Sequence, residues 1–213
     1  MQAVAEDWDI DGWDQAYRNE ETPWHSDHPH RELARLVEAG EWRPGRILDV
    51  GCGRASNLIW LAQRGFEGWG VDVSSEAIRQ ALGRPGAERL RLQTLNALDI
   101  GSLAEKFDYV LDMGCYHLHE FTPELRPRHA VAVHSVLRGG GELLLMCFNP
   151  REPVDWGGPR RVPREELDLI FGPHFVLHEI REAQWRATDE SEGPWSWVSR
   201  WRPRMSHQGS TPV

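Results

Sequence analysis

The sequence contains little cysteine, no excess of basic residues and no long hydrophobic run, and each shortage excludes a class of protein. Its three cysteines, Cys52, Cys115 and Cys147, are an odd number without the spacing of a metal site. We therefore expect reduced thiols in a cytoplasmic protein. No apolar stretch reaches the length of a membrane-spanning helix, and the acidic first residues differ from the basic start of a signal peptide.

Basic residues are also few: the chain has 24 Lys and Arg residues but 33 Asp and Glu residues, which gives a formal net charge of −9. An acidic surface repels nucleic acids and anionic membranes, so we expect a small-molecule partner, no nucleic acid and no membrane. The 213 residues are enough for one domain with a sizeable core. We therefore expect a single domain over residues 1–213.

Strand and helix patterns alternate along the middle of the chain. Strand-like runs cover residues 46–50, 68–73, 91–95, 107–113 and 139–148, and helical patterns cover 30–42, 57–66, 74–82 and 127–137. This alternation predicts an α/β fold, with a Rossmann-like, mostly parallel sheet and helices on both faces. Residues 174–180 and 195–203 predict an antiparallel pair at the sheet edge. The small polar residues 206–213 are expected to fray.

The segment "RILDVGCGRASN" (residues 46–57) joins a predicted strand to a glycine turn. Ligands of doubly wound sheets bind at such a turn, and in dinucleotide proteins a pyrophosphate rests there on a helix N-terminus. Asp49, near the carboxyl end of the strand, would oppose a pyrophosphate and favours a cationic ligand. Ala55 stands where a third glycine is common. Gly51 and Gly53 alone remain a weak signal, because many such turns are purely structural.

Two further markers follow the next two predicted strands. Asp72 ends the second strand, 19 residues after Gly53, where an acid can accept both hydroxyls of a ribose. Asn96, Ala97 and Leu98 follow the third strand, where an adenine ring would lie. For the neighbouring Asp99 we favour a role as a helix cap.

Taken in order, "ILDVGCGRAS", "GVDVS", "NALDI" and "FDYVLDMG" resemble the four motifs of the class I S-adenosylmethionine (SAM) methyltransferases. The resemblance covers residues 45–150. It implies SAM as cofactor, S-adenosylhomocysteine as product, and a seven-stranded sheet whose last strand is antiparallel. The methionine part of SAM would lie over the glycines, where its ammonium and sulfonium charges suit Asp49. The cofactor-binding residues implied in the body of the fold are Asp49, Gly51, Cys52, Gly53, Asn57, Asp72, Val73, Asn96, Ala97, Leu98, Asp112, Met113 and Gly114.

The N-terminal segment, residues 1–30, is polar, and its Trp13, Tyr17 and Trp24 show no helical or strand period. It resembles the N-terminal segment of the thiopurine methyltransferases and of the related thiol, halide and tellurite-type enzymes, as does "GGPRRVPREEL" (residues 157–167). In those enzymes an aromatic segment closes over the cofactor and acceptor. The resemblance implies that Trp13 and Trp24 contact the cofactor and that Tyr17 is a catalytic candidate. We expect residues 1–24 to be a mobile lid; the alternative is that these rings only fasten the segment to the body.

The stretch "LDMGCYHLHE" (residues 111–120) carries the candidate base. The resemblance places His117 beside the acceptor, and a histidine that titrates near neutrality can take the proton of a thiol or hydroxyl. A structural role, as a helix cap or a partner of the backbone, remains open. Arg160 or Arg161 could stabilise a thiolate or hold an acidic acceptor.

His25, His28 and His30 invite a zinc interpretation, but their loop offers no fixed geometry and no cysteine assists them. We therefore expect no metal.

These patterns predict methyl transfer from SAM to a small soft nucleophile, foremost a thiol, by in-line displacement in a monomeric enzyme. Two alternatives stay open: O- or N-methylation of a small metabolite, and a SAM-binding regulator without catalysis. Nucleic-acid and protein methylation are disfavoured, because "FNPREP" (residues 148–153) differs from the N-P-P-[YF] motif of amino-methylating enzymes. The sequence does not identify the acceptor.

Overall fold

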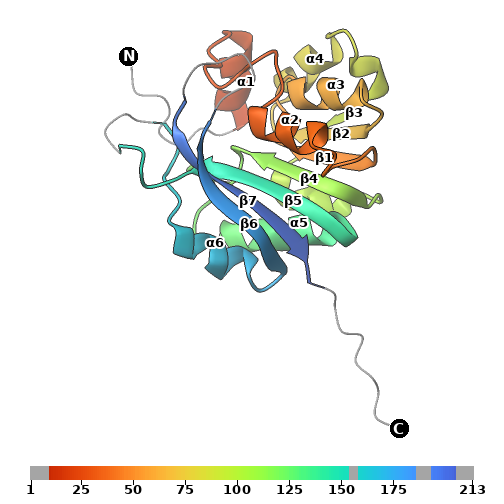
Figure 1. Cartoon of the computed structure of the whole chain (residues 1–213). Helices are drawn as coiled ribbons and strands as arrows, with labels where there is room; N and C mark the ends of the chain where they lie inside the picture. The colour runs from red at the N-terminus through yellow and green to blue at the C-terminus, as the bar shows by residue number, and fades with distance from the viewer. Residues whose placement is uncertain (1–9, 154–157, 186–192, 205–213) are drawn as a thin grey trace.

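A computed structural model of the chain describes residues 10–153, 158–185 and 193–204. Seven strands form one sheet in the order β3-β2-β1-β4-β5-β7-β6 (Figure 1). The strands are β1 (Arg46–Val50), β2 (Glu67–Asp72), β3 (Arg91–Thr94), β4 (Phe107–Met113), β5 (Leu137–Phe148), β6 (Phe175–Gln184) and β7 (Trp195–Pro203). Strands β1 to β5 pair in parallel, and the expected α/β fold is confirmed.

Helices cover both faces of the sheet (Figure 1). The α-helices are α1 (Ile10–Arg18), α2 (Arg31–Glu38), α3 (Ser56–Ala62), α4 (Ser75–Leu82), α5 (Leu125–Val136) and α6 (Arg164–Phe171), and two 3₁₀ turns are η1 (Ala87–Arg89) and η2 (Ala97–Ser102). Helices α2, α3 and α4 lie on one face, and α5 and α6 lie on the other. No helix within the described ranges is long and apolar enough to cross a membrane.

The expected antiparallel pair at the C-terminal end of the chain is confirmed, with one refinement of its order. Strand β7 runs antiparallel to both β5 and β6, so the reversed strand lies between them and β6 forms the edge. The apolar run of β5 is buried from Leu143 to Phe148, as a central strand covered on both faces requires. Its alternate side chains join the two hydrophobic clusters of the core.

Helix α1 corrects the expectation that the N-terminal segment lacks a helical period. Trp13 and Tyr17 are four residues apart and share one side of this helix, which precedes the helix-breaking Pro23. Asp14, on the same helix, accepts hydrogen bonds from Ser74 Oγ (2.6 Å) and the Glu76 backbone N–H (3.0 Å). A carboxylate on α1 thus satisfies donors at the N-terminus of α4 and holds the two helices together.

Capping residues set several of the other boundaries. Ser74 caps α4 by accepting from the Ala77 N–H at 3.0 Å. At η2 the cap is Asn96, whose Oδ1 accepts from the Leu98 N–H at 2.9 Å, so the expectation of an Asp99 cap was wrong. The predicted frayed tail, residues 206–213, lies outside the described residues.

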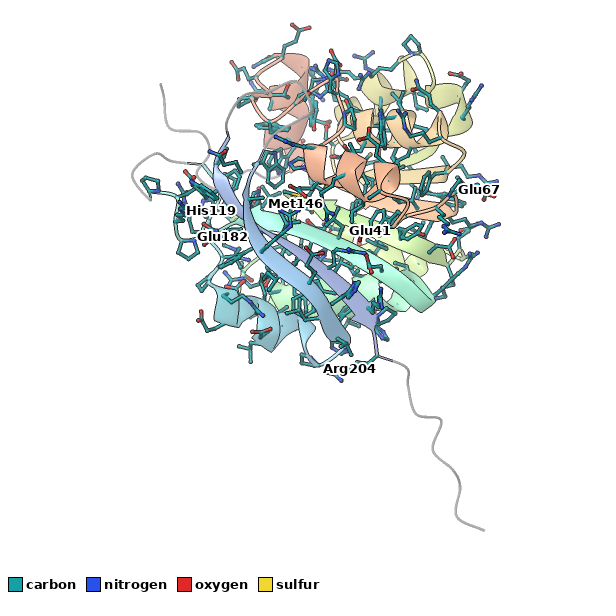
Figure 2. The ribbon with its side chains drawn as sticks, in the orientation of Figure 1. Glu41, Glu67, His119, Met146, Glu182 and Arg204 are labelled. Carbon is teal, nitrogen blue, oxygen red and sulfur yellow. The ribbon has the colours of Figure 1, made fainter. Side chains whose placement is uncertain are left out.

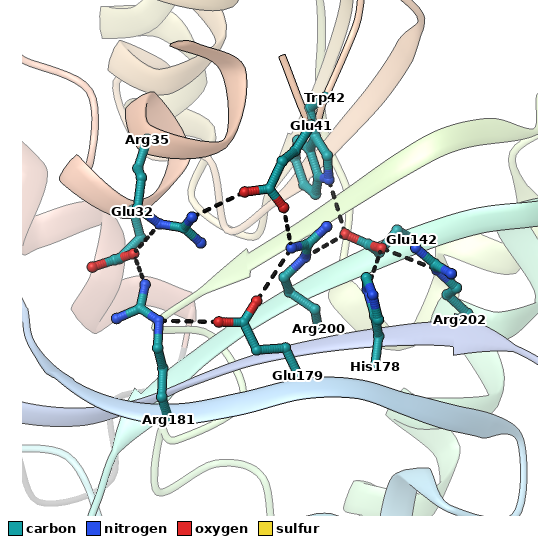
Figure 3. Close-up of polar contacts among 10 residues, drawn as sticks. All are labelled: Glu32, Arg35, Glu41, Trp42, Glu142, His178, Glu179, Arg181, Arg200 and Arg202. Carbon is teal, nitrogen blue, oxygen red and sulfur yellow. Dashed lines mark hydrogen bonds and ion pairs between the residues drawn. The ribbon is translucent and has the colours of Figure 1, made fainter. Parts of the chain in front are cut away.

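A network of ion pairs connects α2 and the following loop to strands β5, β6 and β7 (Figure 3). At its centre Glu142 Oε1 accepts from Arg200 Nε at 2.7 Å and from Trp42 Nε1 at 2.9 Å. Both charged side chains are only 6% exposed. We call this the sheet-flank network; its members are Glu32, Arg35, Glu41, Trp42, Glu142, His178, Glu179, Arg181, Arg200 and Arg202.

Candidate active site

The carboxyl ends of the parallel strands meet at one end of the molecule. Figure 2 places His119 and Glu182 at this end and Glu67, at the start of β2, at the opposite end. The turn after β1 has left-handed backbone at Gly51 (φ 71°), Gly53 (φ 52°) and Ala55 (φ 60°). The two glycines leave room for a ligand to approach the backbone closely. This is the turn that the sequence predicted.

Asp49 lies beneath this turn and is 3% exposed. Burial raises the pKa of its carboxyl group to about 8, the nearby carboxylates of Asp112 and Asp72 add to the shift, and a hydrogen bond from Asn57 opposes it. Within the described residues Asp49 forms no ion pair with a lysine or arginine. A buried carboxyl group without a cationic partner favours a positively charged ligand, because such a ligand stabilises its ionised form. The ammonium and sulfonium groups of SAM fit this requirement.

Asp72 ends β2 and holds the turn in place. Its Oδ2 accepts from the Gly53 N–H and its Oδ1 from the Ser74 N–H, both at 2.9 Å. Burial raises the pKa of this carboxyl group despite these bonds. Each oxygen has a further lone pair, so Asp72 can accept from two hydroxyls in addition to its backbone donors.

The segment expected beside an adenine ring leaves the sheet next to Asp72, whose carbonyl accepts from the Leu95 N–H at 2.9 Å. Ala97 and Leu98 are half-buried, and Asn96 is exposed with its side chain engaged as the η2 cap. The structure therefore brings this segment to the same edge as the glycine turn. Cys52 and Val73, the other predicted contacts of the first two turns, are buried and half-buried there.

Asp112, at the end of β4, is fully buried. Its Oδ1 accepts from the Cys115 and Tyr116 N–H groups at 3.0 Å each, and its Oδ2 lies 2.7 Å from His129 Nε2. These bonds shape the loop that follows β4. We therefore assign Asp112 to positioning that loop, whereas the neighbouring Met113 and Gly114 are partly exposed.

Asn57 joins three parts of the site. Its Oδ1 accepts from the His30 N–H at 2.9 Å, and its Nδ2 lies 3.6 Å from Met113 Sδ. A hydrogen bond to Asp49 adds the first strand to this group. Asn57 therefore ties the start of α2 to the ends of β1 and β4.

The aromatic residues of the N-terminal segment lie together over the glycine turn. A side chain at Gly53 would place its Cβ 2.8 Å from the Tyr17 hydroxyl, to which Trp24 Nε1 donates at 3.4 Å. Burial and the nearby Asp72 raise the pKa of Tyr17, so its phenol stays protonated. Trp13 packs edge-on against Trp24 with ring centroids 5.5 Å apart.

Trp13 also connects this segment to the loop after β4, because its Nε1 donates to Glu120 Oε1 at 3.0 Å. Glu120 itself is half-buried. This hydrogen bond therefore joins helix α1 to the loop after β4.

His117 is buried in the loop after β4, and its Nδ1 accepts from the Phe148 N–H at 2.9 Å. Burial, with the nearby guanidinium groups of Arg160 and Arg161, lowers its pKa to about 3. A neutral ring whose Nδ1 accepts a hydrogen bond carries its proton on Nε2. This geometry favours an N–H donor over the proton-accepting base that the sequence suggested.

The two arginines considered for the acceptor both have partners in the fold. Arg160 Nη1 donates to Glu166 Oε1 at 2.8 Å, and its Nη2 donates to the Tyr116 carbonyl at 3.0 Å. Arg161 donates to the carbonyls of Pro159 and Pro153. Arg160 therefore holds residues 158–167 against the loop after β4.

The histidines of the N-terminal loop have separate tasks. His30 caps α2 by accepting from the Glu32 N–H at 3.2 Å, and His25 Nε2 lies 3.2 Å from Asp27 Oδ1. Among the described residues, no three His, Cys, Asp or Glu side chains form a group that could hold a metal ion.

Sequence reasoning missed Asp14, Glu120, His129 and Trp185. Asp14 was detectable in part, because Trp13 and Tyr17 at helical spacing define a helix on which Asp14 also lies. Trp185 stands just after β6 with no periodic neighbour, so no sequence signal places it near the site.

The chain is also similar in sequence to known proteins. The model of the thiopurine S-methyltransferase family matches residues 8–201. A thiopurine S-methyltransferase of Pseudomonas aeruginosa is 29% identical over 189 residues, covering 80% of this chain and 85% of that protein. A 2-heptyl-1-hydroxyquinolin-4(1H)-one methyltransferase of Mycobacteroides abscessus is 28% identical over 166 residues, covering 76% of this chain and 72% of that protein.

Solved structures share the fold. One, reported for the conversion of a disulfide bond into a thioacetal group during echinomycin biosynthesis, has a TM-score of 0.79 at 25% identity and covers 92% of this chain and 93% of its own. The 1,6-didemethyltoxoflavin-N1-methyltransferase of Burkholderia thailandensis, with bound S-adenosylhomocysteine, has a TM-score of 0.70 at 19% identity and covers 94% and 93%.

Proposed function

The chain belongs to the thiopurine S-methyltransferase family, and we propose that it transfers the methyl group of SAM to the sulfur atom of a small-molecule thiol. It is a SAM-dependent methyltransferase, in agreement with its relatives and with its seven-stranded sheet. The observation that carries the proposal is Asp49, a buried carboxylate beneath the glycine turn with no arginine or lysine ion pair in the described residues.

SAM supplies an electrophilic methyl group on a positively charged sulfur. Asp49 would hold its positive groups, Asp72 would accept from the ribose hydroxyls, and Gly51 and Gly53 would leave room for the methionine chain. The segment Asn96–Leu98 would flank the adenine. Tyr17, Trp13 and Trp24 would cover the cofactor from the N-terminal side, where their hydrogen bonds and ring contacts already hold them.

In-line displacement at a methyl group needs alignment and the exclusion of water more than it needs acid or base. The Trp13–Glu120 hydrogen bond joins the N-terminal cover to the loop after β4, and so closes one side of the site. The hydrogen bonds that Asp112 accepts fix that loop. These residues therefore supply the alignment.

A sulfur acceptor agrees with the state of His117. A thiol has an ordinary pKa of about 8.5 and is partly ionised near neutral pH, so it needs no strong base. The Nε2–H of His117 can donate to a thiolate, whereas an alcohol would require a base that this ring does not provide. The proton of the thiol is lost to solvent before the methyl group moves.

Oxygen or nitrogen acceptors form the second candidate. The Mycobacteroides relative is named for an acceptor with a hydroxyl and a carbonyl group, which contains no thiol. A SAM-binding regulator without turnover is the alternative outside catalysis.

We further propose that the enzyme is a monomeric, single-domain cytoplasmic protein that acts on a small molecule and binds no nucleic acid or membrane. All three cysteines are free, which suits a reducing compartment. The cover of the site comes from the same chain, which supports a complete site in one copy. Analytical ultracentrifugation tests the monomer.

Thermal unfolding with added ligands tests the cofactor. SAM and S-adenosylhomocysteine should raise the melting temperature, and at about 100 times the dissociation constant they should add roughly 2.7 kcal/mol of stability. NAD should add nothing. Asp72→Ala should bind SAM much more weakly in calorimetry, since two hydroxyls lose a charged acceptor. A shift with NAD and none with SAM would overturn the assignment.

A thiol and an alcohol on the same carbon skeleton test the acceptor, with release of S-adenosylhomocysteine as the readout. We expect faster methylation of the thiol, with a rate that rises through the ionisation of the thiol itself. His117→Gln, which keeps an N–H donor, should retain more activity than His117→Ala. Preference for the alcohol would contradict a sulfur acceptor, and no turnover with any acceptor would favour the regulator.

A further inference from the structure

A buried hydrogen bond joins the end of β4 to helix α5. Asp112 Oδ2 lies 2.7 Å from His129 Nε2, and both side chains are fully buried. A carboxylate only accepts hydrogen bonds, so the imidazole donates through its Nε2–H. Among the described residues His129 Nδ1 has no hydrogen-bond partner, which leaves Asp112 as the single polar partner of this ring there.

Two aromatic rings of the loop between β4 and α5 orient the imidazole. Tyr116 stacks on His129 with ring centroids 5.9 Å apart and an interplanar angle of 27°, and Phe121 meets it edge-on at 4.9 Å. Tyr116 is itself held, because its hydroxyl donates to Glu166 Oε1 at 2.7 Å. The imidazole therefore cannot turn away from Asp112 without displacing rings that pack against it.

The bond from His129 fixes the plane of the Asp112 carboxylate. The other oxygen of this group, Oδ1, accepts from the Cys115 and Tyr116 N–H groups at 3.0 Å each. Gly114, with φ of 103°, allows the backbone to turn so that both N–H groups reach this oxygen. Because the two oxygens rotate together, a donor on Oδ2 also holds Oδ1 in place beneath the loop.

The loop that Asp112 holds lies against the glycine turn. Asp112 pairs in the sheet with Val50, the residue before Gly51. A Cβ atom built on Gly51 would lie 3.3 Å from Cys115 Cβ and 3.6 Å from Cys115 Sγ. The hydrogen bonds of Asp112 therefore set how closely Cys115 approaches the turn over which the methionine part of SAM would lie.

From this arrangement we infer that His129 is a positioning residue for methyl transfer. Through Asp112 it holds the loop after β4 at the distance from the glycine turn at which acceptor and methyl group are aligned. The ring itself is fully buried and does not line the crevice. The kinetic part of the inference rests on the proposed function, because turnover is followed with a thiol. In-line displacement depends steeply on alignment, so a displaced loop should lower kcat more than binding.

Two amide side chains at position 129 test the inference. His129→Gln places an N–H donor where Nε2 stands, whereas the shorter side chain of His129→Asn does not reach Asp112. For each protein kcat and KM are measured with thiophenol at saturating SAM, and SAM affinity is measured by calorimetry. We expect His129→Asn to lower kcat about tenfold to a hundredfold, with a much smaller change in SAM affinity, and His129→Gln to restore most of the loss.

Val133→Ala is the matched control for packing. Val133 lies one turn further along α5, is fully buried and has no polar group that could bond Asp112. Urea unfolding should show that Val133→Ala and His129→Asn both lose stability, but Val133→Ala should leave kcat unchanged. Equal losses of kcat in these two variants, or in His129→Gln and His129→Asn, would show that His129 only packs the helix and would overturn the inference.

Hydrogen exchange of the free protein separates this inference from the proposed function. The amides to follow by NMR are those of Cys115 and Tyr116, which donate to Asp112. We expect exchange about tenfold faster in His129→Asn, and close to the wild-type rate in His129→Gln and Val133→Ala. This result would support the positioning of the loop even if the wild type does not methylate thiophenol, which would speak against the proposed function alone. Unchanged exchange in His129→Asn would contradict the inference.

Discussion

Two buried carboxylates in the same sheet have opposite surroundings. Burial alone would raise the pKa of Glu142, but hydrogen bonds from Arg200 and Trp42 hold it below its ordinary value. Burial of Asp49 raises its pKa to about 8, and in the described residues no arginine or lysine pairs with it. A buried acid that the fold neutralises itself is structural, whereas one left without a cation marks the place of a charged ligand.

The largest expected effect comes from breaking the sheet-flank network. Arg200→Leu leaves Glu142 buried without its main partner and should lower the free energy of unfolding by about 3–5 kcal/mol. Urea unfolding measures the loss. The control, Arg46→Leu, removes an exposed pair with Glu67 between β1 and β2 and should cost at most about 1 kcal/mol. Equal losses would contradict a structural role specific to the network.

Removing the carboxyl group of Asp49 should raise the free energy of unfolding instead of lowering it. Because the folded-state pKa of Asp49 lies above its ordinary 3.8, the folded protein keeps a proton that the unfolded chain has lost. The stability of the free protein should therefore fall as pH rises from about 4 to 8. Asp49→Asn should lose this part of the decline and should be more stable than the wild type at pH 9. Urea unfolding across this pH range is the measurement, and parallel curves would show that Asp49 is not buried as an acid.

A smaller effect is expected where α1 meets α4. Asp14→Ala should cost about 1–2 kcal/mol, since donors at the N-terminus of α4 lose their acceptor. Asp11→Ala, on the exposed side of the same helix, should cost little. In limited proteolysis Asp14→Ala should be cut faster within residues 10–24, and SAM should slow cleavage of the wild type. Cleavage that SAM does not change would contradict a lid.

The smallest effect concerns the link across the site. Trp13→Phe keeps an aromatic ring but removes the hydrogen bond to Glu120, so SAM binding should weaken by about 0.5–1.5 kcal/mol. Glu120→Gln, which keeps an acceptor, should weaken it less. Calorimetry compares the two variants, and equal affinities for both and the wild type would leave the link without a role in binding.

The strand ends were predictable from sequence because each combines a strong apolar run with a residue that packing does not require. Asp49 and Asp72 stand out for this reason, and the structure brings them to one edge. Helix α1 was not predicted because it contains few apolar residues, so the four-residue spacing of Trp13 and Tyr17 does not stand out in the sequence. The contact of Asp14 with α4 stabilises this helix. The surroundings of His117 depend on Phe148 and Trp185, which are distant in sequence and meet only in the folded sheet.

Counting protons during SAM binding tests most directly whether Asp49 forms the cationic subsite. Calorimetry at pH 6.5, in buffers of different ionisation enthalpy, gives the number of protons released. At this pH the free carboxyl group holds its proton, and a bound cation favours its ionisation. We predict release of close to one proton by the wild type, and its loss in Asp49→Asn together with weaker binding. Equal proton release and equal affinity in the two proteins would contradict the assignment.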